Sequence, residues 1–177
     1  YRDKALLLAR GMTAQDFMDG LLCNSRSNSQ GRQISAHVSA PHLNIISMAG
    51  PVANNALQAV GVAEAIQHQP GNPLVLCGVG DGTTQEGEFF EAVSEAVRRR
   101  LPVLFLVEDN QWAISTRTTG QTYFSPPRGR GDQFMGTDVC RLNGRDPIES
   151  YQGFGKIVQH IRQHREPALV VFDVERL

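Results

Sequence analysis

Two short aliphatic runs, separated by a glycine-rich turn and a segment with helical spacing, constrain the fold of this chain most strongly. The runs are residues 73–79 (PLVLCGV) and 102–107 (PVLFLV). Such runs are typical of strands buried on both faces of a parallel sheet. With the segment between them they predict a βαβ unit, in which a right-handed crossover makes the two strands parallel.

The segment between the two runs has the pattern of an amphipathic helix. We expect Thr83 or Thr84 to cap its N-terminus, because a threonine hydroxyl can accept a hydrogen bond from a free backbone N–H group. Its apolar face is predicted from Phe90, Val93 and Val97, which recur at helical spacing. Arginines at positions 98–100 end the helix, where the helix dipole favours cations.

Polar residues follow each of the two predicted strands directly. Asp81 lies in the turn GDG after the first strand, and Asn110 lies in EDN after the second. Ligands of open α/β sheets bind at the carboxyl ends of the strands, so both side chains are expected at one edge. A bare carboxylate would repel a phosphate there, whereas Mg²⁺ held by carboxylate and amide oxygens would join the two. The pattern therefore predicts a metal-diphosphate site.

The remaining sequence alternates in the same way. Helices are predicted at residues 3–10, 13–22, 51–69 and 147–163, and further strands at 139–142 and 168–174. Residues 118–136 are rich in Gly, Pro and Arg and are interpreted as an excursion rather than a packed element. We predict an α/β fold with an open, mostly parallel sheet and helices on both faces. Residues 1–177 are expected to form a single domain that is shorter than the natural one.

Composition narrows the class of protein. The net charge is −1 and no apolar run reaches membrane-spanning length, so neither nucleic acid nor a membrane is expected as a partner. The three cysteines lack C-x-x-C spacing, which favours a reducing compartment. We therefore expect a cytosolic (cytoplasmic) protein.

The GDG turn followed by a strand that ends in Asn resembles the metal-diphosphate motif of thiamine-diphosphate enzymes. Four further segments follow in a familiar order: YRDKALLLARGM from residue 1, GRQISAH from 31, LNIISMAGPVANNALQAVGVAEA from 43 and NQWAIST from 110. Together they resemble the alpha subunit, or alpha half, of 2-oxo acid dehydrogenases of the pyruvate and branched-chain type. The similarity covers nearly the whole chain and is weakest over residues 118–136.

The resemblance implies roles for individual residues. Mg²⁺ would be held by Asp81, Asn110 and the backbone carbonyl of Trp112. His37 is a weak candidate for substrate contact, and the family's catalytic His is expected beyond Leu177. The thiamine diphosphate contacts implied by the resemblance are Tyr1, Arg2, Gly50, Val52, Gly80, Asp81, Gly82, Thr83 and Asn110.

The function implied is oxidative decarboxylation of a 2-oxo acid (a branched-chain 2-oxo acid or pyruvate) with transfer of the acyl group to a lipoyl carrier. Implied partners are a beta subunit or fused beta half, in a heterotetramer or a homodimer of fused chains, and a lipoyl-bearing acyltransferase. The isolated chain is expected to be inactive.

Three alternatives remain open. One is a non-catalytic fragment or assembly module of the same fold, and another is an acetoin dehydrogenase alpha subunit. The third is a dinucleotide-binding domain, suggested by Gly78-Val79-Gly80. It is disfavoured because the G-x-G-x-x-G fingerprint requires glycine at position 83, where this chain has Thr83.

Overall fold

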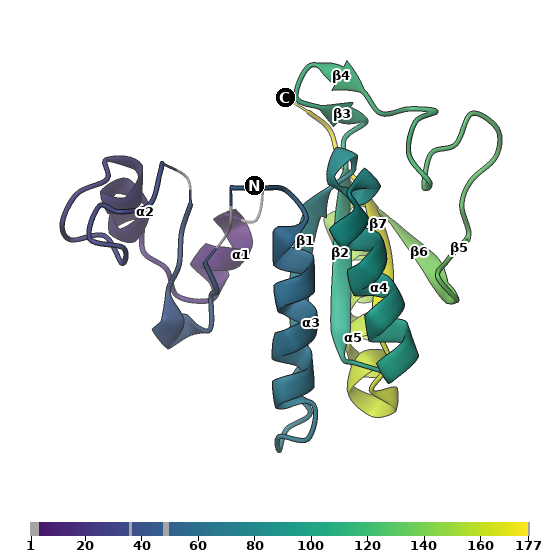
Figure 1. Ribbon diagram of the computed structural model, residues 1–177, viewed down its shortest axis with the longest axis horizontal. Coiled ribbons are helices and arrows are strands. Elements are labelled where there is room, and N and C mark those ends of the chain that lie inside the picture. Colours follow the sequence, from purple (N-terminus) through teal and green to yellow (C-terminus); the bar gives the residue numbers. More distant parts are fainter. Residues whose placement is uncertain (1–3, 36, 48–49, 177) are drawn as a thin grey trace. The chain divides into compact units, whose positions relative to one another are not determined.

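The structure is a computed structural model that describes residues 4–35, 37–47 and 50–176. The chain forms two compact units, Tyr1–Pro51 and Val52–Leu177. The sequence predicted one domain. Figure 1 shows their elements.

The first unit is mainly helical. It contains α1 (Lys4–Ala9), α2 (Ala14–Leu21) and the short 3₁₀ helix η1 (Pro41–Leu43), so both helices predicted from the sequence are present with slightly shorter bounds. Its small core is formed by Met12, Ala40 and Ile45, which are buried.

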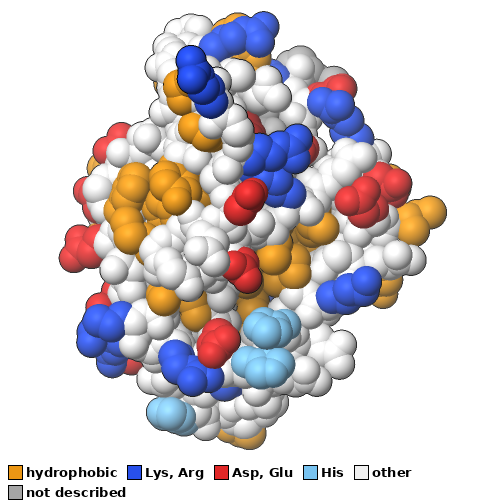
Figure 2. All heavy atoms as spheres, turned by 90° about the vertical axis from the view of Figure 1, so that its right-hand side faces the viewer, with side chains coloured by type: hydrophobic (Ala, Val, Ile, Leu, Met, Phe, Trp, Pro, Cys, Tyr) orange, Lys and Arg blue, Asp and Glu red, His pale blue; other side chains and the backbone are white. Residues whose placement is uncertain are grey.

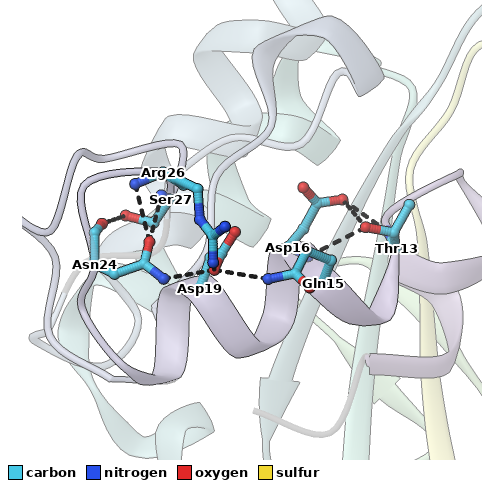
Figure 3. A network of polar contacts seen from close by, with 7 residues as sticks. All are labelled: Thr13, Gln15, Asp16, Asp19, Asn24, Arg26 and Ser27. Carbon is cyan, nitrogen blue, oxygen red and sulfur yellow. Dashed lines mark hydrogen bonds and ion pairs between the residues drawn. The ribbon is translucent and has the colours of Figure 1, made fainter.

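Helix α2 begins at a capping box, shown in Figure 3. The Asp16 backbone N–H donates to the Thr13 hydroxyl oxygen at 3.1 Å, and the Thr13 backbone N–H donates to the Asp16 carboxylate at 2.8 Å. These bonds satisfy backbone donors that a helix start leaves free. The hydrogen bonds from Thr13 also lower the pKa of the Asp16 carboxyl below its usual value.

One turn further on, the buried Asp19 carboxylate connects α2 to the loop that follows it (Figure 3). Its Oδ1 accepts hydrogen bonds from the side-chain amides of Gln15 at 2.8 Å and Asn24 at 2.5 Å. The same oxygen forms an ion pair with the Arg26 guanidinium at 3.3 Å. The Asn24 bond is the main cause of a lowered pKa of Asp19. The network explains how a polar loop without regular structure keeps a defined path.

The second unit contains a five-stranded sheet with strand order β1-β2-β7-β6-β5. In this sheet β1, β2, β7 and β6 pair with their neighbours in parallel. The edge strand β5 pairs with β6 in the antiparallel direction. The predicted open, mostly parallel sheet is thus confirmed. The elements are α3 (Asn54–Ile66), β1 (Val75–Gly80), η2 (Gly82–Gln85), α4 (Gly87–Arg99), β2 (Val103–Asp109), β3 (Trp112–Ala113), β4 (Thr116–Arg117), β5 (Gln133–Phe134), β6 (Thr137–Asn143), α5 (Pro147–His164) and β7 (Ala168–Asp173).

Alternate residues of the central strands enter two separate cores, because successive side chains in a strand point to opposite faces. Phe105 and Leu169 pack with α3 and α4 on one face. Leu106 and Val170 pack with α5 on the other. Helices therefore cover both faces, as predicted, and Figure 1 shows α3 and α4 side by side along the sheet.

The start of α4 differs from the sequence prediction. Residues 82–85 form a 3₁₀ turn, α4 begins at Gly87, and neither Thr83 nor Thr84 caps it. The Thr84 hydroxyl instead donates to the Asp81 backbone carbonyl at 2.6 Å. The buried face of α4 also differs from the prediction, since Phe89 is fully buried while Phe90 and Val97 are only partly buried.

Residues 118–136 were interpreted as an excursion, and most of them lack regular structure. However, Phe124 and Phe134 are buried and join the core against Phe89. The ring centroids of Phe89 and Phe134 lie 5.8 Å apart, and those of Phe124 and Phe134 lie 5.3 Å apart. The segment is thus anchored by its aromatic side chains, a contribution that its Gly and Pro content concealed.

The surface carries both signs of charge. On the face shown in Figure 2, basic and acidic side chains are interspersed, which agrees with the net charge of −1. Over the described residues, no helix combines the length and the apolar composition needed to cross a bilayer.

Candidate functional site

Asp81 and Asn110 lie at the carboxyl ends of two adjacent parallel strands. The register pairs Gly80, the last residue of β1, with Glu108 of β2. Asp81 follows Gly80 directly, and Asn110 follows Asp109, where β2 ends. Both side chains are buried, at 3% and 5% exposure. The two polar groups singled out from the sequence are therefore brought to one edge of the sheet.

The turn after β1 and the hairpin after β2 touch each other at a glycine. A Cβ placed on Gly82 would lie 2.5 Å from the Ala113 Cβ, closer than side-chain atoms approach. Ala113 belongs to β3, which pairs with β4 in a two-residue antiparallel ladder. Glycine at position 82 thus lets the two loops close over the strand ends.

Asp81 is fixed at both its backbone and its side chain. Its backbone carbonyl accepts hydrogen bonds from the N–H group of Thr84 at 3.2 Å and from the Thr84 hydroxyl at 2.6 Å. Its Oδ2 accepts a hydrogen bond from the hydroxyl of Thr118, a buried residue just after β4. The orientation of this carboxylate is therefore set before any ligand arrives.

Asn110 has one amide atom engaged and one without a partner. Its Oδ1 accepts a hydrogen bond from the backbone N–H of Trp112 at 3.0 Å. This bond fixes which amide atom is the oxygen, because an N–H group needs an acceptor. The buried Nδ2 has no hydrogen-bond partner among the described residues. An orphaned buried donor costs about 1–3 kcal/mol, which points to a missing acceptor at this position.

The indole of Trp112 is packed rather than directed at the strand ends. The Arg117 guanidinium lies 4.6 Å from its ring centroid and the Arg176 guanidinium 5.6 Å. Arg176 also donates to the backbone carbonyl of Ile114 in the same hairpin. These cation–π contacts hold the β3–β4 hairpin, which agrees with a site role limited to the Trp112 backbone.

Carboxylates accumulate at this edge. Burial raises the pKa of the Asp109 carboxyl above its usual value, and the nearby Asp81 and Asp173 carboxylates raise it further. Opposing them, the backbone N–H of Gln111 donates to Asp109 Oδ1 at 2.9 Å, and the Arg141 cation also acts to lower this pKa. The excess of negative charge makes this edge a favourable location for a cation.

A cation here could not be held by side-chain His, Cys, Asp and Glu alone, since no group of three or more such residues in the described part of the chain is arranged so that it could hold a metal ion. The ligands predicted from the sequence are the Asp81 carboxylate, the Asn110 Oδ1 and the Trp112 backbone carbonyl, and this set stays a prediction. All are oxygens, the atoms that Mg²⁺ prefers, and Mg²⁺ commonly completes its shell with phosphate oxygens and water. The donor set fits a magnesium-phosphate ligand.

The other sequence-predicted residues are placed as follows. Gly80 ends β1, and Thr83 lies in η2, where its backbone carbonyl accepts a hydrogen bond from Glu86 at 3.1 Å. Val52 is exposed near the start of the second unit. Their proposed cofactor contacts stay predictions.

Four of the site residues predicted from the sequence belong to the first unit. Gly50 is exposed, and a Cβ there would meet nothing within 4 Å. His37 is half-buried, with its Nδ1 3.3 Å from the Ser35 carbonyl oxygen. Tyr1 and Arg2 lie outside the described residues. The roles of all four stay predictions.

Sequence reasoning missed two residues of this site. Thr118 lies in the segment interpreted as an excursion, and nothing in its spacing links it to Asp81, 37 residues earlier. Asp109 was seen as part of EDN, but its burial between two other carboxylates depends on β7 lying beside β2. Only the strand order reveals these contacts.

A parallel sheet with oxygen ligands at the carboxyl ends of adjacent strands defines the class of α/β proteins that bind ligands at that edge. Within this class, the chain belongs to the dehydrogenase E1 component family, whose match covers residues 1–176.

Relatives with curated descriptions support the assignment. The chain is 32% identical over 171 residues to a 2-oxoisovalerate dehydrogenase subunit alpha of Bacillus subtilis, covering 96% of this chain and 52% of the relative. It is 33% identical over 177 residues to a pyruvate dehydrogenase E1 component subunit alpha of Porphyra purpurea, covering 96% and 51%. The chain thus spans about half the length of these curated relatives.

Solved structures share the fold. A transketolase from Campylobacter jejuni superposes with a TM-score of 0.66 at 20% identity, covering 96% of this chain and 27% of that chain. A putative thiamin diphosphate-dependent enzyme from Mycobacterium smegmatis superposes with a TM-score of 0.52 at 20% identity, covering 72% and 23%. These likenesses confirm the α/β fold class.

Proposed function

We propose that this chain is the diphosphate-binding part of a thiamine-diphosphate-dependent 2-oxo acid dehydrogenase. The observation that carries the proposal is the pair Asp81 and Asn110, buried at the ends of adjacent parallel strands, with the Asn110 Nδ2 left without a hydrogen-bond partner among the described residues. Membership of the dehydrogenase E1 component family supports it.

The proposed cofactors are thiamine diphosphate and Mg²⁺. The Asp81 carboxylate, the Asn110 Oδ1 and the Trp112 carbonyl would hold the metal, and the orphaned Asn110 Nδ2 is suited to donate to a diphosphate oxygen. Gly82 lets the two loops approach over the site. When bound, the cofactor supplies the carbanion chemistry that decarboxylates a 2-oxo acid.

The residues of this chain anchor and orient rather than transfer protons. Asp81 is held by Thr84 and Thr118 in one orientation. A preformed set of ligands costs no reorganisation when the cofactor binds, and this improves both affinity and positioning.

The substrate and partners of the whole protein follow from its relatives. Their descriptions name 2-oxoisovalerate and pyruvate dehydrogenases and alpha subunits. We propose a branched-chain 2-oxo acid or pyruvate as substrate, a beta subunit or fused beta half as partner, and a lipoyl carrier as acyl acceptor. The cytosolic location expected from the number and spacing of the three cysteines stays a prediction.

The test is calorimetric titration of thiamine diphosphate into the full-length protein assembled with its beta partner, with Mg²⁺ and then with EDTA. We expect binding only with Mg²⁺. Asp81→Asn, which keeps the shape but removes the charge, should weaken Mg²⁺ binding by at least about 100-fold, the upper end of what losing an outer partner of a metal ligand costs. The matched control is Asp132→Asn, at an exposed acidic residue of the loop before β5.

Two outcomes would overturn the proposal. One is thiamine diphosphate binding that EDTA leaves unchanged. The other is a folded wild-type assembly that does not bind thiamine diphosphate at millimolar Mg²⁺, which would favour the non-catalytic assembly module.

A further inference from the structure

We propose that Thr118 is a positioning residue that holds the Asp81 carboxylate in its metal-binding orientation. The inference rests on the proposed function and assigns a part to a residue of the loop that follows β4. The observation behind it is the hydrogen bond from the Thr118 hydroxyl to Asp81 Oδ2, between two side chains that are 6% and 3% exposed.

The direction of this hydrogen bond follows from chemistry. An ionised carboxylate can only accept, so the hydroxyl must donate. Charge-assisted bonds of this kind are about twice as strong as neutral ones, and both partners are shielded from water here. The bond occupies Oδ2 and fixes the rotation of the carboxylate, which determines where Oδ1 points.

The backbone of Thr118 is fixed as well, so that the hydroxyl is a rigid support. Its N–H donates to the Gln111 carbonyl at 3.1 Å, and its own carbonyl accepts from the Gln121 N–H at 2.8 Å. Both partners lie in the loops next to the site.

The methyl group of Thr118 packs on the side of the residue opposite to its hydroxyl. It lies 3.9 Å from the position that a Cβ on Gly82 would take, next to Ala113. A β-branched side chain has few χ1 rotamers, so packing the methyl on one side directs the hydroxyl to the other. The hydroxyl branch thus contacts Asp81, and the methyl branch lies beside the space that a side chain at position 82 would occupy.

The loop that begins at Thr118 is anchored at its far end. Phe124 and Phe134 are buried in the core, and the Arg141 guanidinium on β6 donates to the Phe124 carbonyl at 2.7 Å. These contacts give the segment a fixed path, so Thr118 cannot readily move away from Asp81. A hydroxyl of one loop thereby orients a metal ligand on another.

The experiment compares three variants of the full-length protein assembled with its beta partner. Thr118→Val removes the hydroxyl at nearly constant shape, Thr118→Ser keeps the hydroxyl, and Thr119→Val removes an exposed hydroxyl one residue away that donates to Gln111 Oε1. The readout is the Mg²⁺ dissociation constant, measured by titrating Mg²⁺ calorimetrically in the presence of saturating thiamine diphosphate.

We expect Thr118→Val to weaken Mg²⁺ binding about 10- to 100-fold, the loss typical of removing a hydrogen-bonding partner of a metal ligand. Thr118→Ser and Thr119→Val should stay within about threefold of the wild type, because both keep the bond to Asp81. If Thr118→Val does not fold, Thr118→Ala is compared with Thr118→Ser in its place, with circular dichroism as the check on folding.

The inference is overturned if Thr118→Val binds Mg²⁺ as tightly as the wild type. It is also overturned if Thr118→Ser loses as much affinity as Thr118→Val, since keeping the hydroxyl would then not preserve Mg²⁺ binding. Failure of the proposed function looks different, because the wild type itself would then show no Mg²⁺-dependent binding of thiamine diphosphate.

Discussion

At the scale of single residues, the turn after β1 can approach the hairpin after β2 because Gly82 has no side chain. Gly82 faces Ala113 across the gap between the two loops, with 2.5 Å to the Ala113 Cβ and 3.5 Å to its Cα from where a Cβ would stand. Neither atom belongs to a flexible side chain, so the loops themselves would have to separate. Such a movement would also disturb Asp81, the preceding residue in the chain.

We therefore expect Gly82→Ala to destabilise the protein by about 1–3 kcal/mol, the usual cost of overpacking, and to weaken binding of thiamine diphosphate with Mg²⁺. Urea unfolding and calorimetry measure the two effects. The control is Gly87→Ala at the start of α4, where a Cβ would meet nothing within 4 Å. Equal stability of the two variants would show that the contact with Ala113 does not matter.

Residues at strand ends were predictable from the sequence, whereas their supporting contacts were not. Asp81 and Asn110 could be found because an aliphatic run marks a buried strand and its end marks the ligand-binding edge. Thr118 could not, because its contact depends on the path of an irregular loop. That path is set by buried aromatic residues, whose three-dimensional neighbours no periodicity reveals.

At the scale of elements, the start of α2 shows how a local pattern determines a helix end. Thr13 and Asp16 exchange hydrogen bonds in a capping box, and the lowered pKa of Asp16 indicates that the folded state favours its ionised form. Because the folded-state pKa is lower than the unfolded value, this stabilisation is present above the ordinary carboxyl pKa of 3.8 and is lost as the pH falls through the lowered value.

Thr13→Ala should destabilise α2 by about 1 kcal/mol at neutral pH, as is usual for loss of an N-cap, which corresponds to about fivefold faster amide exchange. The difference from the wild type should shrink once the pH lies below the lowered pKa of Asp16, because the protonated carboxyl supports the box poorly in both proteins. Ser25→Ala, at an exposed serine of the following loop, is the control. Unchanged exchange of the α2 amides in Thr13→Ala would contradict the prediction.

The loop 118–136 shows the limit of composition as a guide to elements. Its Gly, Pro and Arg content correctly indicated irregular backbone, but it hid two phenylalanines that enter the core. Phe134 is 2% exposed and contacts Phe89, Phe90, Tyr123 and Phe124. An irregular segment can thus contribute as much to packing as a helix does.

Phe134→Ala should cost about 3–5 kcal/mol of unfolding free energy, because it removes a buried aromatic ring and leaves a cavity. Guanidinium unfolding followed by circular dichroism measures the loss. The control is Tyr151→Ala, which truncates an aromatic ring that is 84% exposed on α5. A loss below about 1 kcal/mol for Phe134→Ala, the size of a peripheral contact, would show that the loop is not part of the core.

At the scale of the whole molecule, the strand order determines which segments far apart in the sequence lie next to each other. The adjacency of β1 and β2 follows from one βαβ unit and was predicted. The insertion of β7, the last strand in the chain, between β2 and β6 depends on packing of elements far apart in sequence. The four long parallel strands are therefore accessible from pattern, whereas the two-residue strands β3, β4 and β5 are not. The position of β7, and with it the carboxylates around Asp109, is not accessible either.

This position makes β7 the point where both cores meet. Leu169 lies in the core shared with α3 and α4, while the next residue, Val170, lies in the core shared with α5, and both are fully buried. Loss of packing on one face should therefore destabilise the other through the strand itself. The second unit is expected to unfold as one cooperative body rather than as two independent layers.

Leu169→Ala should lower the unfolding free energy by about 2–5 kcal/mol and do so equally for probes on the two sides of the sheet. Suitable probes are amide exchange in α4, which packs in the first core, and amide exchange in α5, which packs in the second. Ile148→Ala, at a side chain that is 69% exposed, should change neither. If α5 kept wild-type protection in Leu169→Ala while the amides of α4 lost theirs, the two faces would be energetically separate, and β7 would not link them.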